Sequence, residues 1–178
     1  MRLTVLLAFA DARAREAIAR ALTRSGVAVS GAFGDGASLL RAARKLGPCL
    51  ALVGTRLPDM TPQELQAALE GRAALRVLCR AGDAGDGGGV RREAMPATGP
   101  ELAALVRGML LEEEERLREG ARRGETDERL VVLAKEAMQR RMGCTEDEAH
   151  RALQRMSMAK GLRMAEAARR VLEDEKTT

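Results

Sequence analysis

The sequence contains almost no aromatic residues. Among 178 residues there are two phenylalanines, Phe9 and Phe33, and no Trp or Tyr. This scarcity excludes RNA-binding domains whose sheet presents aromatic side chains on which bases stack. Metal ligands are scarce too: one histidine and three scattered cysteines, without CxxC or HxxxH spacing, argue against a zinc site or a disulfide framework. We therefore expect no metal and no cofactor.

Long apolar stretches are also missing. No stretch of about 18 apolar residues occurs, so we expect no transmembrane helix and no membrane partner. The N-terminal segment MRLTVLLAFADARAR contains a short apolar run but no small-residue cleavage site, which argues against a secretory signal. These absences favour a cytoplasmic protein that is helical or mixed in structure.

Arginine is abundant, and the distribution of charge matters more than the total. Of the 30 basic residues 26 are arginines, and the net charge is only +4. Residues 1–110 carry 15 basic and 10 acidic side chains, residues 111–128 carry 4 and 8, and residues 129–178 carry 11 and 8. The acidic run at residues 112–115 is typical of a solvated helix between domains. We therefore place a domain boundary there.

The first basic block alternates short apolar segments with amphipathic ones. Asp11 is placed to cap a helix after the first apolar segment. Residues 81–90 are rich in glycine, so we expect a loop or a single turn there instead of a helix. The alternation predicts an α/β domain with a doubly wound parallel sheet. The predicted strands span residues 3–8, 27–30, 50–53, 74–79 and 90–95, and the predicted helices span residues 12–24, 35–46 and 62–70.

The C-terminal basic block predicts three short helices. Thr126 or Asp127 caps the first, which ends at Gly143. Thr145 begins a capping box for the second, which Gly161 ends, and a third helix follows. Helices this short bury too little surface alone, so they must pack on one another or on a partner. The methionines of this block are interpreted as core filling in preference to a flexible binding surface; they are Met138, Met142, Met156, Met158 and Met164.

A set of motif positions runs through residues 129–175 without gaps, namely Ala134, Lys135, Met138, Arg141, Gly143, Glu148, Ala149, His150, Met158 and Ala168. Through them the segment resembles the ANTAR domain, the RNA-binding module of AmiR- and NasT-like transcription antitermination regulators. The resemblance implies that residues 127–178 form a three-helix RNA-binding domain. It also implies that residues 99–126 hold the last helix of the sheet domain and an acidic linker.

The segment LVGTRLPDM at residues 52–60 is similar to the third strand and following loop of response-regulator receiver domains. The similarity implies a flavodoxin-like (CheY-like) sheet for residues 1–98, with the fourth helix short or missing. Receivers need two acids that bind Mg²⁺, an aspartate that accepts the phosphoryl group, a Thr or Ser, and a Lys. The corresponding residues here are Phe9, Ala10, Gly54, Arg80 and Met95. They predict a pseudo-receiver that is not phosphorylated. Asp59, which remains nearby, is interpreted as a turn residue.

The ANTAR resemblance implies an RNA-binding transcription antiterminator. Such a protein binds a two-hairpin structure in the leader of a nascent mRNA, contacts the hairpin loops and prevents the terminator from forming. Lys and Arg neutralise phosphates. Any base stacking falls to Arg or His150, because the domain has no aromatic residue. The candidate RNA-contacting residues are Lys135, Gln139, Arg140, Arg141, Lys160 and Arg163.

The same resemblance implies a homodimer and a ligand-sensing regulatory protein that controls it in place of phosphorylation. A coiled coil in the linker has weak support, because Gly120 and Gly124 interrupt its seam. Two other functions remain open: a DNA-binding helix-turn-helix regulator, and a protein-interaction scaffold whose basic face is only solvated. An enzyme is the least expected class, because the sequence offers no nucleophile, metal cluster or acid–base pair.

Overall fold

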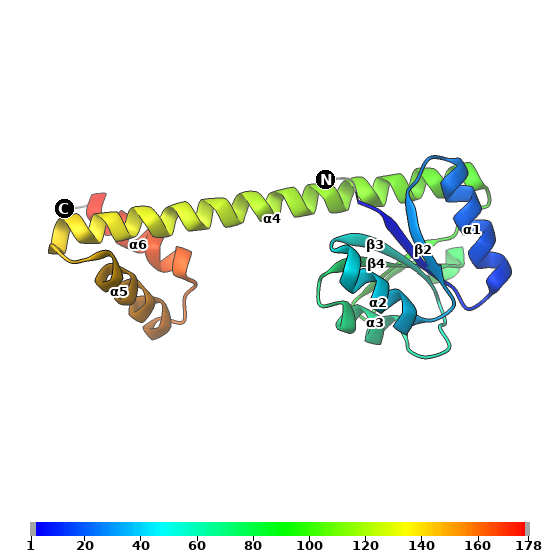
Figure 1. Ribbon diagram of the computed structural model, residues 1–178, viewed down its shortest axis with the longest axis horizontal. Helices are drawn as coiled ribbons and strands as arrows, with labels where there is room; N and C mark the ends of the chain where they lie inside the picture. The colour runs from blue at the N-terminus through cyan, green and yellow to red at the C-terminus, as the bar shows by residue number, and fades with distance from the viewer. Residues whose placement is uncertain (1–2, 177–178) are drawn as a thin grey trace. The chain divides into compact units, whose positions relative to one another are not determined.

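The computed structural model describes residues 3–176 and divides the chain into two compact units, Met1–Arg116 and Leu117–Thr178 (Figure 1). The first unit contains an α/β sheet domain, and the second is built from helices. One helix, α4 at Gly99–Met142, contributes residues to both units.

The first unit contains a six-stranded sheet with the order β2-β1-β3-β4-β6-β5. Neighbouring strands are parallel except for β5 and β6, so the predicted doubly wound parallel sheet is confirmed. The strands are β1 Val5–Ala8, β2 Val29–Phe33, β3 Cys49–Gly54, β4 Ala73–Cys79, β5 Gly85–Gly87 and β6 Val90–Ala94. The helices are α1 Ala12–Arg24, α2 Gly36–Leu46, α3 Pro62–Leu69 and the first part of α4.

The connection between β4 and β6 is where the sequence predicts a loop or a single turn. A 3₁₀ helix at Ala81–Asp83 leads into β5, which pairs with β6 in antiparallel fashion. The reversal between the two strands uses Gly88 and Gly89, with positive φ angles of 60° and 76° that glycine adopts without strain. The short strand β5 is an addition to the prediction.

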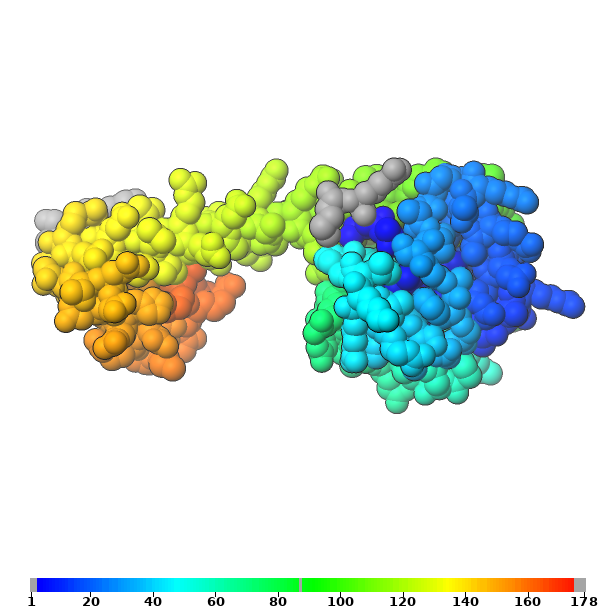
Figure 2. All heavy atoms as spheres, viewed as in Figure 1, coloured from blue at the N-terminus to red at the C-terminus, as the bar shows by residue number. Residues whose placement is uncertain are grey.

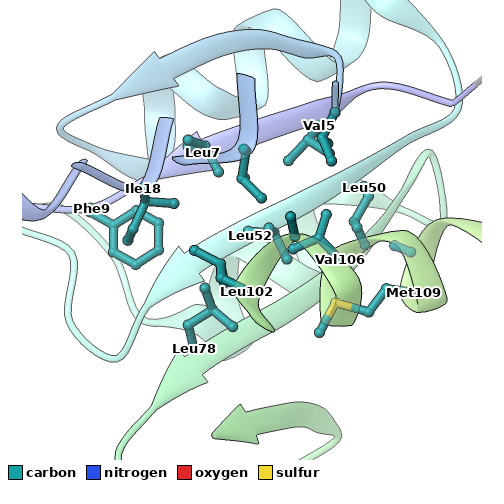
Figure 3. Close-up of a cluster of buried hydrophobic side chains, with 14 residues drawn as sticks. Val5, Leu7, Phe9, Ile18, Leu50, Leu52, Leu78, Leu102, Val106 and Met109 are labelled. Atoms are coloured by element: carbon teal, nitrogen blue, oxygen red, sulfur yellow. The ribbon is translucent and has the colours of Figure 1, made fainter. Parts of the chain in front are cut away.

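The core of the sheet domain lies in two layers, one on each face of the sheet. Because side chains alternate along β1, Val5 and Leu7 pack against α1 and α4, as Figure 3 shows, and Leu6 packs against α2 and α3. All three side chains are fully buried. Asp11 caps α1 as predicted, and its carboxylate accepts a hydrogen bond from the backbone N–H of Ala14 at 2.8 Å.

Helix α4 is continuous where the sequence predicts two separate helices. Its 44 residues run through Gly120 and Gly124. The helix start predicted at Thr126 or Asp127 is therefore wrong, and the Thr126 hydroxyl instead donates to the carbonyl oxygen of Arg122 at 2.9 Å. A glycine costs a helix only about 1 kcal/mol. Ending one helix and nucleating another a few residues later is less favourable than accepting that cost.

The second unit packs α5 (Glu146–Ala159) and α6 (Met164–Lys176) with the end of α4, and Figure 2 shows its surface. Its core contains small side chains at the places where the helices meet. Ala134, Ala149 and Ala168 are all fully buried. Side chains of this size let helix backbones approach more closely than leucine or isoleucine would.

Two predicted helix boundaries in this unit are confirmed. Gly143, with a φ of +60°, follows the last residue of α4, and its N–H donates to the carbonyl oxygen of Gln139 at 2.9 Å. Thr145 and Glu148 form the capping box that starts α5. A glycine in a left-handed conformation thus marks the end of α4, and a polar cap marks the start of α5.

Candidate nucleic-acid interface

Lys135 of α4 forms an ion pair with Glu146 at the start of α5. Its Nζ atom lies 2.6 Å from Oε1 of Glu146, and the Lys135 side chain is only 16% exposed. The hydrogen bond and charge of this lysine hold the pKa of Glu146 below its usual value. Lys135 therefore helps to fix α5, and its charge is already compensated within the protein.

Four of the candidate RNA-contacting residues lie near the end of α4, but they face different ways. On a helix with 3.6 residues per turn, Lys135 and Gln139 lie about 40° apart, Arg140 lies about 100° beyond Gln139, and Arg141 about 200° beyond it. Arg140 and Arg141 are exposed, whereas Gln139 is half-buried. Residues that are close in the sequence are thus distributed around the helix.

Lys160 and Arg163 flank the turn between α5 and α6, and both are exposed. Glu166 accepts a hydrogen bond from the backbone N–H of Arg163 at 2.9 Å, and it lies 3.4 Å from the guanidinium group. Ser157, which was not predicted from the sequence, also contributes here, because its hydroxyl donates to the carbonyl oxygen of Leu162 at 2.6 Å. This bond closes the turn and positions the two basic residues.

The motif positions divide between the core and the surface. Those that are buried are Ala134, Met138, Ala149 and Ala168, and those at helix ends are Gly143 and Glu148. His150 is exposed, and Met158 is 74% exposed. Met142 is also 53% exposed. The interpretation of the methionines as core filling therefore holds for Met138, and for Met156 and Met164, which pack against the same apolar cluster, and it is wrong for Met142 and Met158.

The ends of α4, α5 and α6 enclose a cavity of about 160 Å³, lined by Ala137, Met138, Arg141, Met142, Met156, Val171 and Asp174. Arg141, Met142 and Asp174 are exposed, so the cavity opens to solvent on their side. Arg141 is the one candidate RNA-contacting residue in this lining. The cavity was not predicted from the sequence because its walls come from three helices, and spacing along one helix does not reveal their contact.

Arg163 belongs to a different hollow in the same unit. This hollow, of about 560 Å³, is lined by the start of α6 and by Asp127, Glu128 and Val131 of α4, among others. Val131 and Arg141 are ten residues apart, which is about 15 Å along a helix. The structure therefore does not gather the six candidate residues into one patch.

One hollow in the first unit is lined by four of the five residues that the sequence aligns with the phosphorylation residues of receivers. Phe9, Gly54, Arg80 and Met95 line this hollow of about 780 Å³, which lies at the carboxyl ends of β1, β3, β4 and β6. Ala10 is exposed and lies outside that lining. A Cβ atom on Gly54 would lie 3.1 Å from Cδ1 of Phe9. The Phe9 ring thus occupies the space beside residue 54.

Asp59 lies five residues after Gly54 in the sequence, and its carboxylate binds the N-terminus of α2. It accepts hydrogen bonds from the backbone N–H groups of Gly36 and Ala37, both at 2.8 Å, and these bonds lower its pKa. Its role is therefore larger than that of the turn residue predicted from the sequence. Across residues 3–176, no three His, Cys, Asp or Glu side chains are grouped to hold a metal ion, and no helix has the length and apolarity to cross a membrane.

Both units are similar to known domains. Residues 119–172 match the ANTAR domain family. The receiver domain of NarL from Mycobacterium tuberculosis is 22% identical, with 61% of this chain and 96% of that chain covered and a TM-score of 0.52. A CheY-like receiver domain from Methanospirillum hungatei is 16% identical, with 65% and 99% covered and a TM-score of 0.54. The response regulator StyR is 16% identical, with 98% and 100% covered and a TM-score of 0.57. No curated protein sequence matches the chain.

Proposed function

Because this chain carries an ANTAR domain and its first unit has the receiver fold, we propose that it is an RNA-binding transcription antiterminator. It binds a two-hairpin structure in nascent leader mRNA in the cytoplasm. By holding that structure it prevents an overlapping terminator from forming, so that transcription continues. The role requires no catalysis.

The match of residues 119–172 to the ANTAR domain carries this proposal. Charge supports it, because residues 129–178 carry 11 basic and 8 acidic side chains. Arg140, Arg141, Lys160 and Arg163 are exposed and suited to phosphates and base edges. Lys135 is instead paired with Glu146, so we assign it a positioning role for α5.

A gel shift tests the proposal. The probes are a pool of tandem-hairpin RNAs with randomised loops and the same sequences as duplex DNA, each across a salt series. We expect RNA to bind and DNA not to bind, with an affinity that falls linearly in log salt as phosphate contacts are screened. Equal binding of DNA would favour a helix-turn-helix regulator, and binding of neither would favour a scaffold.

Two arginine variants test the location of the interface. Arg141→Ala and Arg163→Ala each remove an exposed guanidinium group, and we expect each to lower RNA affinity about tenfold. The matched control is Arg20→Ala, which removes an exposed arginine from α1 in the first unit. An equal loss in Arg20→Ala would mean that only total charge matters and that the interface is misplaced.

We also propose that control passes through a ligand-sensing partner protein and not through phosphorylation. The Phe9 ring supports this, because it lies 3.1 Å from where the Cβ atom of a side chain at position 54 would be and so crowds that position. Incubation with acetyl phosphate and Mg²⁺, followed by mass spectrometry, is expected to give no phosphorylated protein, even for Gly54→Asp. A stable phosphoryl adduct on that variant would contradict this part of the proposal.

The active species in this proposal is a homodimer. Helix α4 carries exposed apolar side chains at Leu111, Val132 and Leu133, which are 62%, 46% and 50% exposed. Leu111 and Leu133 lie about 40° apart around an ideal helix, so one partner helix along α4 would cover both. Sedimentation should give a dimer for the wild type and a monomer for Leu111→Glu combined with Leu133→Glu. A dimer that survives both changes would place the interface elsewhere.

A further inference from the structure

We propose that the cavity between the ends of α4, α5 and α6 receives one unstacked nucleobase from the RNA. This inference rests on the proposed function, and it adds the place and the manner in which a base is held. The cavity lies wholly within the three-helix unit, and its lining includes Arg141.

The size and the walls of the cavity suit a flat ring. Its volume is about 160 Å³, and an apolar protein cavity of about 150 Å³ is known to hold benzene. Ala137 and Met138 are buried, and Met156 and Val171 are half-buried. Methionine side chains adapt their shape, and their sulfur atoms make favourable contacts with aromatic rings.

The open side of the cavity supplies polar groups that a base requires. Arg141 is exposed there, so a guanidinium donor lies at the side of the lining formed by α4. The guanidinium plane of Arg141 can also stack on the base face. A base presents both an apolar face and hydrogen-bonding edges, which matches this combination of walls and rim.

The guanidinium group of Arg141 favours a nucleic acid over an apolar peptide as the occupant of the cavity, because Arg141 is exposed and belongs to the lining. Its charge can neutralise a phosphate beside an inserted base. Because residues 117–178 contain no aromatic side chain, this cavity replaces the aromatic surface on which other RNA-binding proteins stack bases.

The first test removes bases from the RNA. Full-length protein is mixed with the tandem-hairpin RNA that binds tightest in the randomised pool, and each loop nucleotide is replaced in turn by an abasic ribose. The phosphate remains in these RNAs, so charge is unchanged. We expect one abasic position to weaken binding by about ten- to hundredfold, as loss of a stacked base does elsewhere, and the other positions to have smaller effects.

The second test fills the cavity. Val171→Phe should weaken binding of the intact RNA to the level of the critical abasic RNA, and it should abolish the further effect of removing that base. The two changes remove the same contact, so their effects are not additive. The control is Ala104→Phe, which adds the same ring at an exposed position of α4 in the first unit. It should bind like the wild type and keep its full sensitivity to the abasic position.

A readout on the wild-type protein gives an answer even if Val171→Phe fails to fold. With ¹³C-methyl methionine, the ring current of an inserted base should shift the signals of Met138, Met142 and Met156, and the critical abasic RNA should leave them unshifted. Two results would overturn the cavity assignment alone. One is tight RNA binding that leaves these methionine signals unshifted, and the other is a Val171→Phe variant that is as sensitive to the abasic change as the wild type. Absence of any RNA binding would instead contradict the proposed function.

Discussion

At the scale of single residues, the alanines at three motif positions of the three-helix unit show what a motif position can and cannot reveal. A small residue in the sequence is compatible with close approach of either RNA or another helix. In the structure Ala134, Ala149 and Ala168 are fully buried and belong to one apolar cluster. They therefore serve the packing of α4, α5 and α6.

This packing leads to a prediction for Ala149. Its replacement by leucine adds three carbons at a fully buried position, so we expect Ala149→Leu to lower the free energy of unfolding of the three-helix unit by about 1–3 kcal/mol. Urea denaturation followed by circular dichroism measures the change. Ala159→Leu makes the same replacement at an exposed position of α5 and should change stability by no more than about 0.5 kcal/mol.

At the scale of elements, local signals predict most of the fold. Short apolar runs predict the parallel strands because both faces of the sheet are covered, and the cap at Asp11 and the capping box at Thr145 predict two helix starts. The continuity of α4 through Gly120 is not predicted, because a glycine weakens a helix without ending it. The cavity beside Arg141 is not predicted either, since it depends on contacts between helices that are distant in the sequence.

Replacement by alanine should have opposite effects at two glycines inside α4 and at the glycine that follows its last residue. Gly120 and Gly124 lie inside the helix with nothing within 4 Å of an added Cβ. We expect Gly120→Ala and Gly124→Ala each to stabilise α4 by up to about 1 kcal/mol. Gly143→Ala should destabilise by about 1–2 kcal/mol, because its φ of +60° disfavours any side chain. Hydrogen exchange of α4 amides measures all three, and equal signs would contradict a helix that continues through Gly120 and Gly124 and ends before Gly143.

The start of α5 should respond to pH. The backbone N–H of Thr145, followed by its hydroxyl, holds the pKa of Glu148 below its usual value. A carboxylate with a lowered folded-state pKa stabilises the fold above its unfolded pKa, and that stabilisation is lost as the pH falls through the folded value. We therefore expect the midpoint temperature of the three-helix unit to fall as the pH drops below about 4.3. In Glu148→Gln the midpoint should be lower at neutral pH and should fall less on acidification.

At the scale of the whole molecule, the two units have separate cores. Two apolar clusters contain residues of the first unit only, and the third contains residues of the second only. Segments with independent cores unfold as independent cooperative units. Because the cores are separate, we expect a substitution in the core of the receiver-fold unit to leave the packing of the other unit unchanged.

Calorimetry of the full chain tests this independence. We expect two unfolding transitions, and Leu7→Ala should lower only that of the sheet domain, because Leu7 is fully buried in its core and such a truncation costs about 2–5 kcal/mol. Ala149→Leu should lower only the other transition. If either substitution moved both transitions together, the units would be coupled, and loss of function in one could then follow directly from strain in the other.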